Sequence, residues 1–163
     1  MTRWWWVLAL VWALPVAAEE HPLSFLLGAW CGEGTTSGAP SSQRMSWEST
    51  LGGKFVRLHL HNRIGNPGGE VEFEGIGYYR PEEGGGLQGT WVDSLGELHP
   101  ISARLRGQEL EATWGTADTK LGRSIYRLAD GTLEVEDSVR RGDSWAVFGR
   151  ATLRPCPAAG AAP

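Results

Sequence analysis

The chain has 163 residues, with 19 acidic and 15 basic side chains that give a formal net charge of −4 at pH 7. The basic residues are scattered rather than clustered, which excludes the electrostatic pattern of a nucleic-acid-binding protein. After the first residues no linker, internal repeat or long run of charge divides the chain, so we expect one domain.

The N-terminus has the three parts of a secretory signal peptide. Arg3 supplies a positive charge, residues 4–14 form an apolar run, and small residues lead up to Ala18. The sequence therefore predicts a signal peptide over residues 1–18 and an exported protein, periplasmic or secreted. Because the apolar run is shorter than the roughly 20 residues that cross a bilayer, we expect no membrane span after cleavage. An uncleaved membrane anchor is the alternative.

The rest of the chain is dominated by strand signals. One helical turn is expected over residues 23–28. Ten segments then alternate apolar and polar residues with the period of two that is typical of strands: 30–34, 44–50, 54–63, 70–80, 87–93, 99–106, 109–114, 123–128, 132–138 and 144–154. Glycine-containing turns separate most of them.

This succession of hairpins without a long crossover predicts an all-β fold with almost no helix. It favours a single antiparallel up-and-down β-barrel of about ten strands over a sandwich, because closure removes the exposed sheet edges. We assign residues 19–154 to the barrel. Residues 155–163 are rich in Pro, Ala and Gly and are predicted to form a disordered tail.

Two cysteines lie near the two ends of the predicted barrel. Cys31 is close to the start of the first strand, and Cys156 follows the last strand. In a closed meander the first and last strands pair antiparallel, so closure brings the two residues together. An exported protein reaches a compartment where a disulfide persists. We therefore predict a Cys31–Cys156 disulfide, the alternative being two unpaired thiols.

The sequence offers no convincing catalytic or metal-binding group. His59 and His61 share one face of a strand, but Arg57 and Arg63 lie on the same face and disfavour a metal, so this face is interpreted as the polar exterior. The triad residue types around Ser94 fall on a turn and lack a nucleophile elbow. We predict a protein that is not an enzyme and that needs no cofactor.

Aromatic residues are spread over many of the predicted strands. They either line a cavity or fill the barrel solidly. If a cavity exists, strand parity and aromatic content place Tyr79, Trp91, Asp93 and Arg127 near it. An inward arginine would hold the carboxylate of a ligand.

Several motifs resemble a known family. Residues 26–34, 51–55, 74–78 and 89–94 read LLGAWCGEG, LGGKF, EGIGY and GTWVDS. Their order and spacing resemble the lipocalin-like bacterial family called domain of unknown function 1579. That resemblance implies a calycin-type barrel, like those of lipocalins and fatty-acid-binding proteins, with no established activity.

A more distant resemblance, in the G-x-W-x-G-x-G opening, is to the nitrobindin-like haem-binding barrels. That family binds haem through a histidine near the C-terminal end, and residues 144–154 contain none. The sequence thus predicts an exported barrel that binds a small apolar or amphiphilic ligand. A ligand-free structural or interaction barrel is the alternative.

Overall fold

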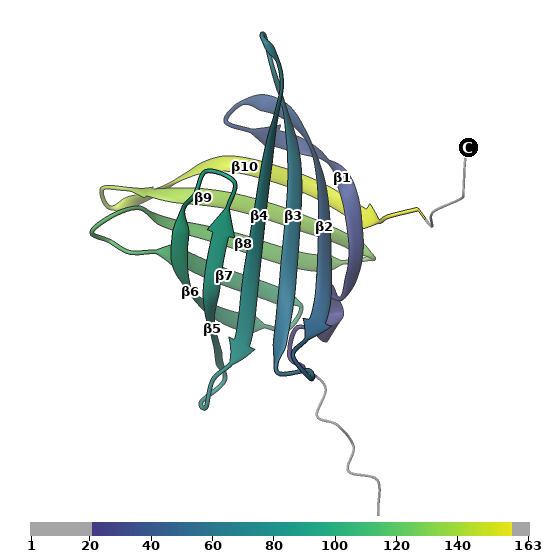
Figure 1. Cartoon of the computed structure of the whole chain (residues 1–163), viewed down its shortest axis with the longest axis vertical. Coiled ribbons are helices and arrows are strands. Elements are labelled where there is room, and N and C mark those ends of the chain that lie inside the picture. The colour runs from purple at the N-terminus through teal and green to yellow at the C-terminus, as the bar shows by residue number, and fades with distance from the viewer. Residues whose placement is uncertain (1–20, 158–163) are drawn as a thin grey trace, which may run out of the picture.

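The computed structural model describes residues 21–157 as one closed barrel of ten antiparallel strands (Figure 1). A 3₁₀-helix, η1, precedes the strands. The elements are η1 (Ser24–Leu26), β1 (Gly28–Thr36), β2 (Ala39–Thr50), β3 (Phe55–Asn66), β4 (Gly69–Pro81), β5 (Gly86–Asp93), β6 (Leu98–Arg106), β7 (Glu109–Gly115), β8 (Leu121–Ala129), β9 (Thr132–Arg141) and β10 (Ser144–Pro155). Each strand pairs with the next, and β1 pairs with β10, so the predicted barrel is confirmed.

The strand alternation explains which face lies inside. In β2 the side chains of Ser41, Gln43, Met45 and Trp47 are buried, while the residues between them are more exposed. The same alternation turns one side of every strand toward a common core. In Figure 1 the long strands β2, β3 and β4 cross in front of β8, β9 and β10, so two layers of the same sheet enclose the interior.

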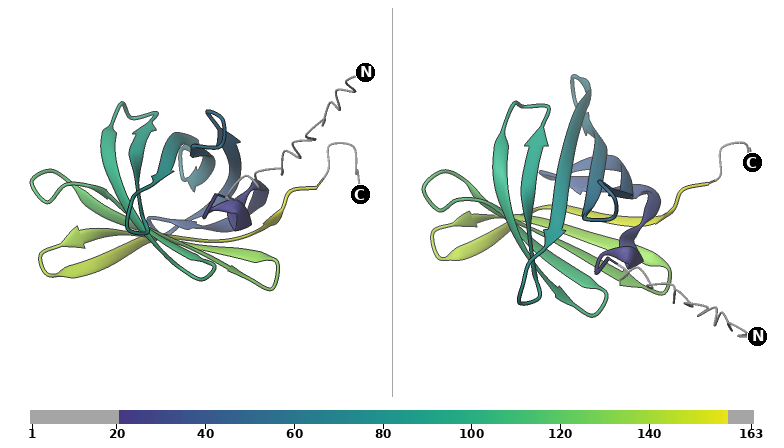
Figure 2. Two further views of the ribbon diagram at one scale, coloured as in Figure 1. Left: turned by 90° about the horizontal axis from the view of Figure 1, so that it is seen from below. Right: turned by 60° about the horizontal axis from the view of Figure 1, so that its bottom comes forward.

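The N-terminal segment closes one end of the barrel. Leu23 and Leu26 are fully buried, and the indole N–H of Trp30 donates to the carbonyl oxygen of Leu26 at 2.8 Å. Figures 1 and 2 show η1 (purple) near the end of β2. The ring of Trp47, at that end of β2, packs on two tyrosines. Its centroid lies 5.5 Å from that of Tyr79 and 5.2 Å from that of Tyr126. This end of the interior is therefore packed solid.

The barrel seam carries the disulfide. Cys31 lies on β1 opposite Arg154 on β10, and its sulfur is bonded to that of Cys156, with Cα atoms 4.9 Å apart. The predicted Cys31–Cys156 pairing is confirmed. The backbone N–H of Cys156 also donates to the carbonyl oxygen of Ala29 at 2.8 Å.

These contacts correct the predicted start of the tail. β10 continues through Pro155, and the disulfide holds Cys156, because pairing with β1 extends beyond Arg154. The remaining tail residues, 158–163, and the predicted signal peptide, 1–18, lie outside the described residues. Within residues 21–157 no helix has the length and apolar character needed to cross a bilayer.

Candidate functional site

A cavity of about 220 Å³ lies inside the barrel, away from the end that η1 closes. Its lining includes Leu95 and Glu97 from the β5–β6 turn and Lys120 from the β7–β8 turn. Deeper residues such as Met45 and Ile101 are apolar. The interior therefore contains a cavity whose wall has both apolar and polar side chains. This cavity extends to the end of the barrel opposite η1.

Glycines on neighbouring strands keep two tryptophan rings flat against the wall. Trp91 on β5 lies opposite Gly77 on β4, and a Cβ atom at Gly75 would come within 2.0 Å of the Trp91 ring. Trp114 on β7 lies opposite Gly122 on β8, where a Cβ atom would also come within 2.0 Å of the ring. Because the rings occupy the space of missing side chains, the centre of the barrel stays open.

Glycines also keep the β1–β10 seam thin. Between Trp30 and Thr36 the inward positions of β1 are Gly32 and Gly34. A Cβ atom at either would collide with backbone of β10, at 2.1 Å for Gly32 and 1.9 Å for Gly34. The strands can approach this closely only where no side chain intervenes. The G-x-W-x-G-x-G sequence thus allows β1 and β10 to pack closely at the seam.

A partly buried acid, Asp137, occupies the β8–β9 side of the cavity. Asp137 lies directly opposite Ser124, whose hydroxyl donates to Asp137 Oδ1 at 2.6 Å. The indole N–H of Trp114 donates to the same Ser124 oxygen at 3.2 Å. Burial raises the pKa of Asp137 from 3.8 to about 6, against the opposing effect of the Ser124 hydrogen bond. At neutral pH this side of the cavity is therefore mostly anionic.

Two tyrosines adjoin this acid. Tyr79 and Tyr126 are both buried and both line the cavity. Burial raises the pKa of each hydroxyl above its ordinary value, and the charge of Asp137 adds to the effect. Both phenols are consequently neutral at any physiological pH and offer hydrogen-bonding groups to the cavity rather than charge.

The opposite side of the cavity carries side-chain amides. Gln43 on β2 and Asn62 on β3 are direct register partners, and each is 5 % exposed. The Asn62 amide donates to the Thr36 hydroxyl at 3.2 Å, and Thr36 donates to Ser41 at 3.2 Å. The carbonyl oxygens of Gln43 and Asn62 have no hydrogen-bond partner among the described residues.

The mouth of the cavity contains a cluster of possible metal ligands, Asp93, Glu97 and His99, whose ligand atoms lie within 4.8 Å of one another. These atoms already have partners. Asp93 Oδ1 accepts the N–H groups of Leu95 and Glu97, and Oδ2 accepts the indole N–H of Trp91 at 3.1 Å.

Glu97 in turn contacts His99 Nε2 at 2.8 Å and Lys120 Nζ at 3.3 Å. The His99 hydrogen bond is the main reason why the pKa of Glu97 is lowered. A metal would have to displace the turn contacts of Asp93 and the ammonium group of Lys120. The cluster fits a folded turn better than a cation site. The Ser94 hydroxyl likewise accepts the Glu74 N–H and holds this turn.

Three of the four residues predicted to lie near a cavity do so: Tyr79, Trp91 and Asp93 line it. The fourth prediction is wrong. Arg127 is exposed outside the barrel, where it pairs with Glu109 at 2.7 Å and Glu134 at 3.5 Å. Alternation along β8 explains this, because the neighbouring Tyr126 faces inward. No inward arginine is available at this position to hold a ligand carboxylate.

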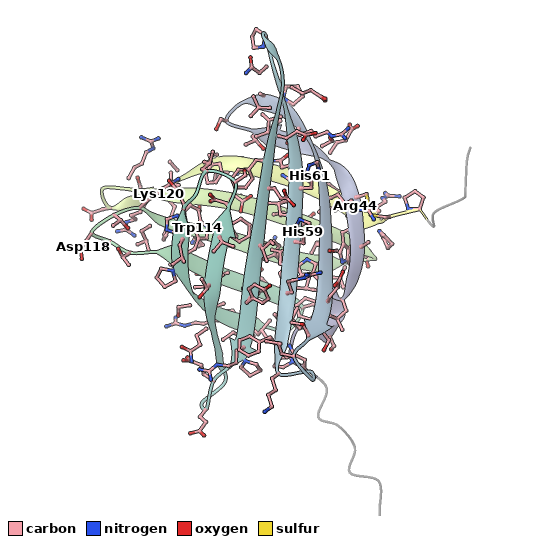
Figure 3. The ribbon with its side chains drawn as sticks, viewed as in Figure 1. Arg44, His59, His61, Trp114, Asp118 and Lys120 are labelled. Atoms are coloured by element: carbon pink, nitrogen blue, oxygen red, sulfur yellow. A yellow bond between two sulfur atoms is a disulfide. The ribbon has the colours of Figure 1, made fainter. Side chains whose placement is uncertain are left out.

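The histidines of β3 lie on the outer surface, as predicted. Figure 3 shows His59 and His61 on the front of the barrel. His59 contacts Glu74 at 2.6 Å and His61 lies 3.8 Å from Glu72, both on the neighbouring strand β4. These residues belong to a polar exterior and do not contribute to the cavity.

Four polar residues that line the cavity were not predicted from the sequence: Gln43, Asn62, Ser124 and Asp137. Asp137 could have been recognised, because it lies two and four residues after Val135 and Leu133 and so points to the same, otherwise apolar, face of the strand. Gln43 likewise shares the parity of Met45 and Trp47. A polar residue on the apolar side of a strand is the feature that would have identified both.

No protein-family model matches the chain, and no curated protein matches it. Among solved structures, the chain is similar to a crystal structure of a mutant of the fluorescent protein UnaG. The two share 15% sequence identity over 81% of this chain and 96% of the other, with a TM-score of 0.49.

Proposed function

We propose that this chain is an exported barrel that holds one small, apolar or amphiphilic molecule in its interior. The observation that carries the proposal is the hollow interior, about 220 Å³ in volume, which Gly75, Gly77 and Gly122 keep open by accommodating the tryptophan rings. The wall combines apolar and aromatic side chains with a few convergent polar groups, the usual composition of a ligand pocket. The volume is below the roughly 300–1,000 Å³ of drug-sized pockets, which favours a small ligand.

Export is part of the same proposal. The Cys31–Cys156 disulfide fits an oxidising, extracytoplasmic compartment. The predicted signal peptide over residues 1–18 would direct the chain there. We further propose membership of the family domain of unknown function 1579. Its supporting motifs, residues 74–78 and 89–94, supply the glycines and Trp91 of the cavity wall.

Native mass spectrometry of the protein purified from its own cells tests the proposal. We expect a retained small-molecule mass that is released on denaturation. Gly75→Ala should lower ligand occupancy, because the new Cβ atom forces the Trp91 ring into the cavity. Thr90→Ala, on the exposed face of the same strand as Trp91, is the matched control and should keep the ligand.

A ligand retained equally by Gly75→Ala and Thr90→Ala would place binding outside the cavity and overturn the proposal. Retention of no molecule, together with failure to bind an apolar probe such as ethylbenzene, would favour the ligand-free barrel instead.

A further inference from the structure

Several acceptor atoms that face the cavity have no hydrogen-bond donor among the described residues. Gln43 Oε1 and Asn62 Oδ1 are buried, lie on paired strands and have no donor within the described residues. A buried acceptor left without a hydrogen bond destabilises the fold, so such groups normally meet water or a ligand. The Asn62 amide orientation is set by its hydrogen bond to Thr36, which leaves the carbonyl oxygen as the free atom.

A carboxylate extends this set of acceptors. Asp137 Oδ1 accepts the Ser124 hydroxyl, whereas no hydrogen bond within residues 21–157 reaches Oδ2. Asp137 lies opposite Gly149, and a Cβ atom at Gly149 would come within 3.2 Å of that free oxygen. Gly149 in turn lies opposite Thr36, the hydrogen-bond partner of Asn62. Asn62 on β3 is thus connected to Asp137 on β9 through its hydrogen bond to Thr36 on β1 and the pairing of Thr36 with Gly149 on β10.

The charged groups of the cavity also favour a positively charged ligand. Among the described residues that line it, Lys120 is the one with a permanent positive charge, and Lys120 is paired with Glu97 at the mouth. Figure 3 shows Lys120 beside the β7–β8 turn, close to Trp114, consistent with its position 5.7 Å from the centroid of that ring. A carboxylate ligand would meet Asp137 without a compensating cation in the interior.

The aromatic lining favours a cation as well. Tyr79, Tyr126, Trp91 and Trp114 all border the cavity, and the negative faces of such rings attract ammonium groups when water is excluded. The two tyrosines are neutral, so they add dipoles and ring faces without adding charge.

We propose that the preferred ligand is a small amphiphile whose polar end is a protonated amine, with Asp137 Oδ2 as its main acceptor and the carbonyl oxygens of Gln43 and Asn62 as further acceptors within the same cavity. This inference rests on the proposed function, and it specifies the charge of the ligand that the cavity takes. The apolar end of the ligand lies among the aromatic rings.

Four probes of one shape test it by isothermal titration calorimetry on the purified, oxidised protein: ethylbenzene, phenethylamine, phenethyl alcohol and phenylacetate. At about pH 7.5 Asp137, with its pKa of about 6, is ionised. We expect phenethylamine to bind at least about tenfold more tightly than phenethyl alcohol, and phenylacetate to bind most weakly.

Two variants locate the preference. Asp137→Asn keeps the size of the side chain and the acceptor for Ser124, so it should remove most of the amine preference while ethylbenzene binds as before. Gln43→Met should weaken the amine without weakening ethylbenzene. Arg127→Gln, an outer-surface change of charge, is the control and should leave the preference intact.

The outcomes separate the two proposals. Binding of ethylbenzene with no preference for the amine, or with a preference for phenylacetate, overturns the inference and leaves the proposed function standing. An amine preference that survives in Asp137→Asn also overturns it. Failure of all four probes to bind overturns both the inference and the proposed function.

Discussion

Replacement of Asp137 by asparagine should stabilise the folded protein at neutral pH. The cavity holds this acid where burial raises its pKa from 3.8 to about 6, with the Ser124 hydrogen bond opposing the rise and the charge of Glu136 adding to it. Ionisation is therefore costlier in the folded state than in the unfolded state. At about 1.36 kcal/mol per pKa unit the ionised carboxylate costs the fold about 3 kcal/mol.

The sign of the pH dependence follows from proton binding. Between pH 3.8 and about 6 the folded state binds more protons at Asp137 than the unfolded state does, so this residue lowers the free energy of unfolding as the pH rises. The neighbouring Tyr79 and Tyr126 have raised pKa values and do not ionise in this range. Asparagine cannot ionise, and it keeps an acceptor for the Ser124 hydroxyl.

Urea unfolding of the wild-type protein and Asp137→Asn at a series of pH values measures the difference directly. We expect the variant to be more stable by about 3 kcal/mol near pH 7.5, with the difference disappearing near pH 4. A difference that does not change with pH, or a variant that is less stable at neutral pH, would refute the assignment of Asp137 as a carboxylate whose ionisation destabilises the fold.

Three further predictions concern the framework around the cavity. Replacing both Cys31 and Cys156 by serine should lower the free energy of unfolding by about 5 kcal/mol, because the disulfide closes a loop with a sequence separation of 125. Equal unfolding midpoints of the wild-type protein with and without reductant would contradict this prediction. Gly122→Ala should push the Trp114 ring into the cavity and weaken the binding of ethylbenzene measured by calorimetry. An unchanged affinity would show that Gly122 does not fix the position of the Trp114 ring. Trp47→Ala should lower the free energy of unfolding in urea by about 3–5 kcal/mol, because the indole is 1 % exposed and packs on two tyrosines. A decrease of less than about 1 kcal/mol would mean that this end of the barrel is loosely packed.

The fold was readable from local patterns. Alternation marked the strands, glycine turns marked the hairpins, and an uninterrupted series of hairpins implied closure, which in turn paired Cys31 with Cys156. Each of these features depends on residues that are near neighbours in sequence or on one topological rule. The start of the tail was misplaced because the β1–β10 pairing, which extends to Pro155, is a long-range contact.

The cavity was less readable, because it depends on register between strands. Whether Trp91 fills the interior or lies against the wall is decided by Gly75 and Gly77 on β4, and strand pairing alone brings them together. The prediction for Arg127 was wrong for a local reason. Successive side chains of a strand point to opposite faces, so the inward direction of Tyr126 turns Arg127 outward. Asp137 gives the interior its acidic character and was not predicted, although its position in the alternation of β9, shared with Leu133 and Val135, could be seen in the sequence.

The central claim is that this barrel binds its ligand inside. The most direct test is a two-dimensional NMR titration of the ¹⁵N-labelled protein with phenethylamine, observed at the indole N–H signals. Those of Trp91 and Trp114, which line the cavity, should shift, whereas that of Trp145, which stacks with Arg123 and Arg140 outside the barrel, should stay fixed. A shift at Trp145 with no change at Trp91 and Trp114 would contradict the account.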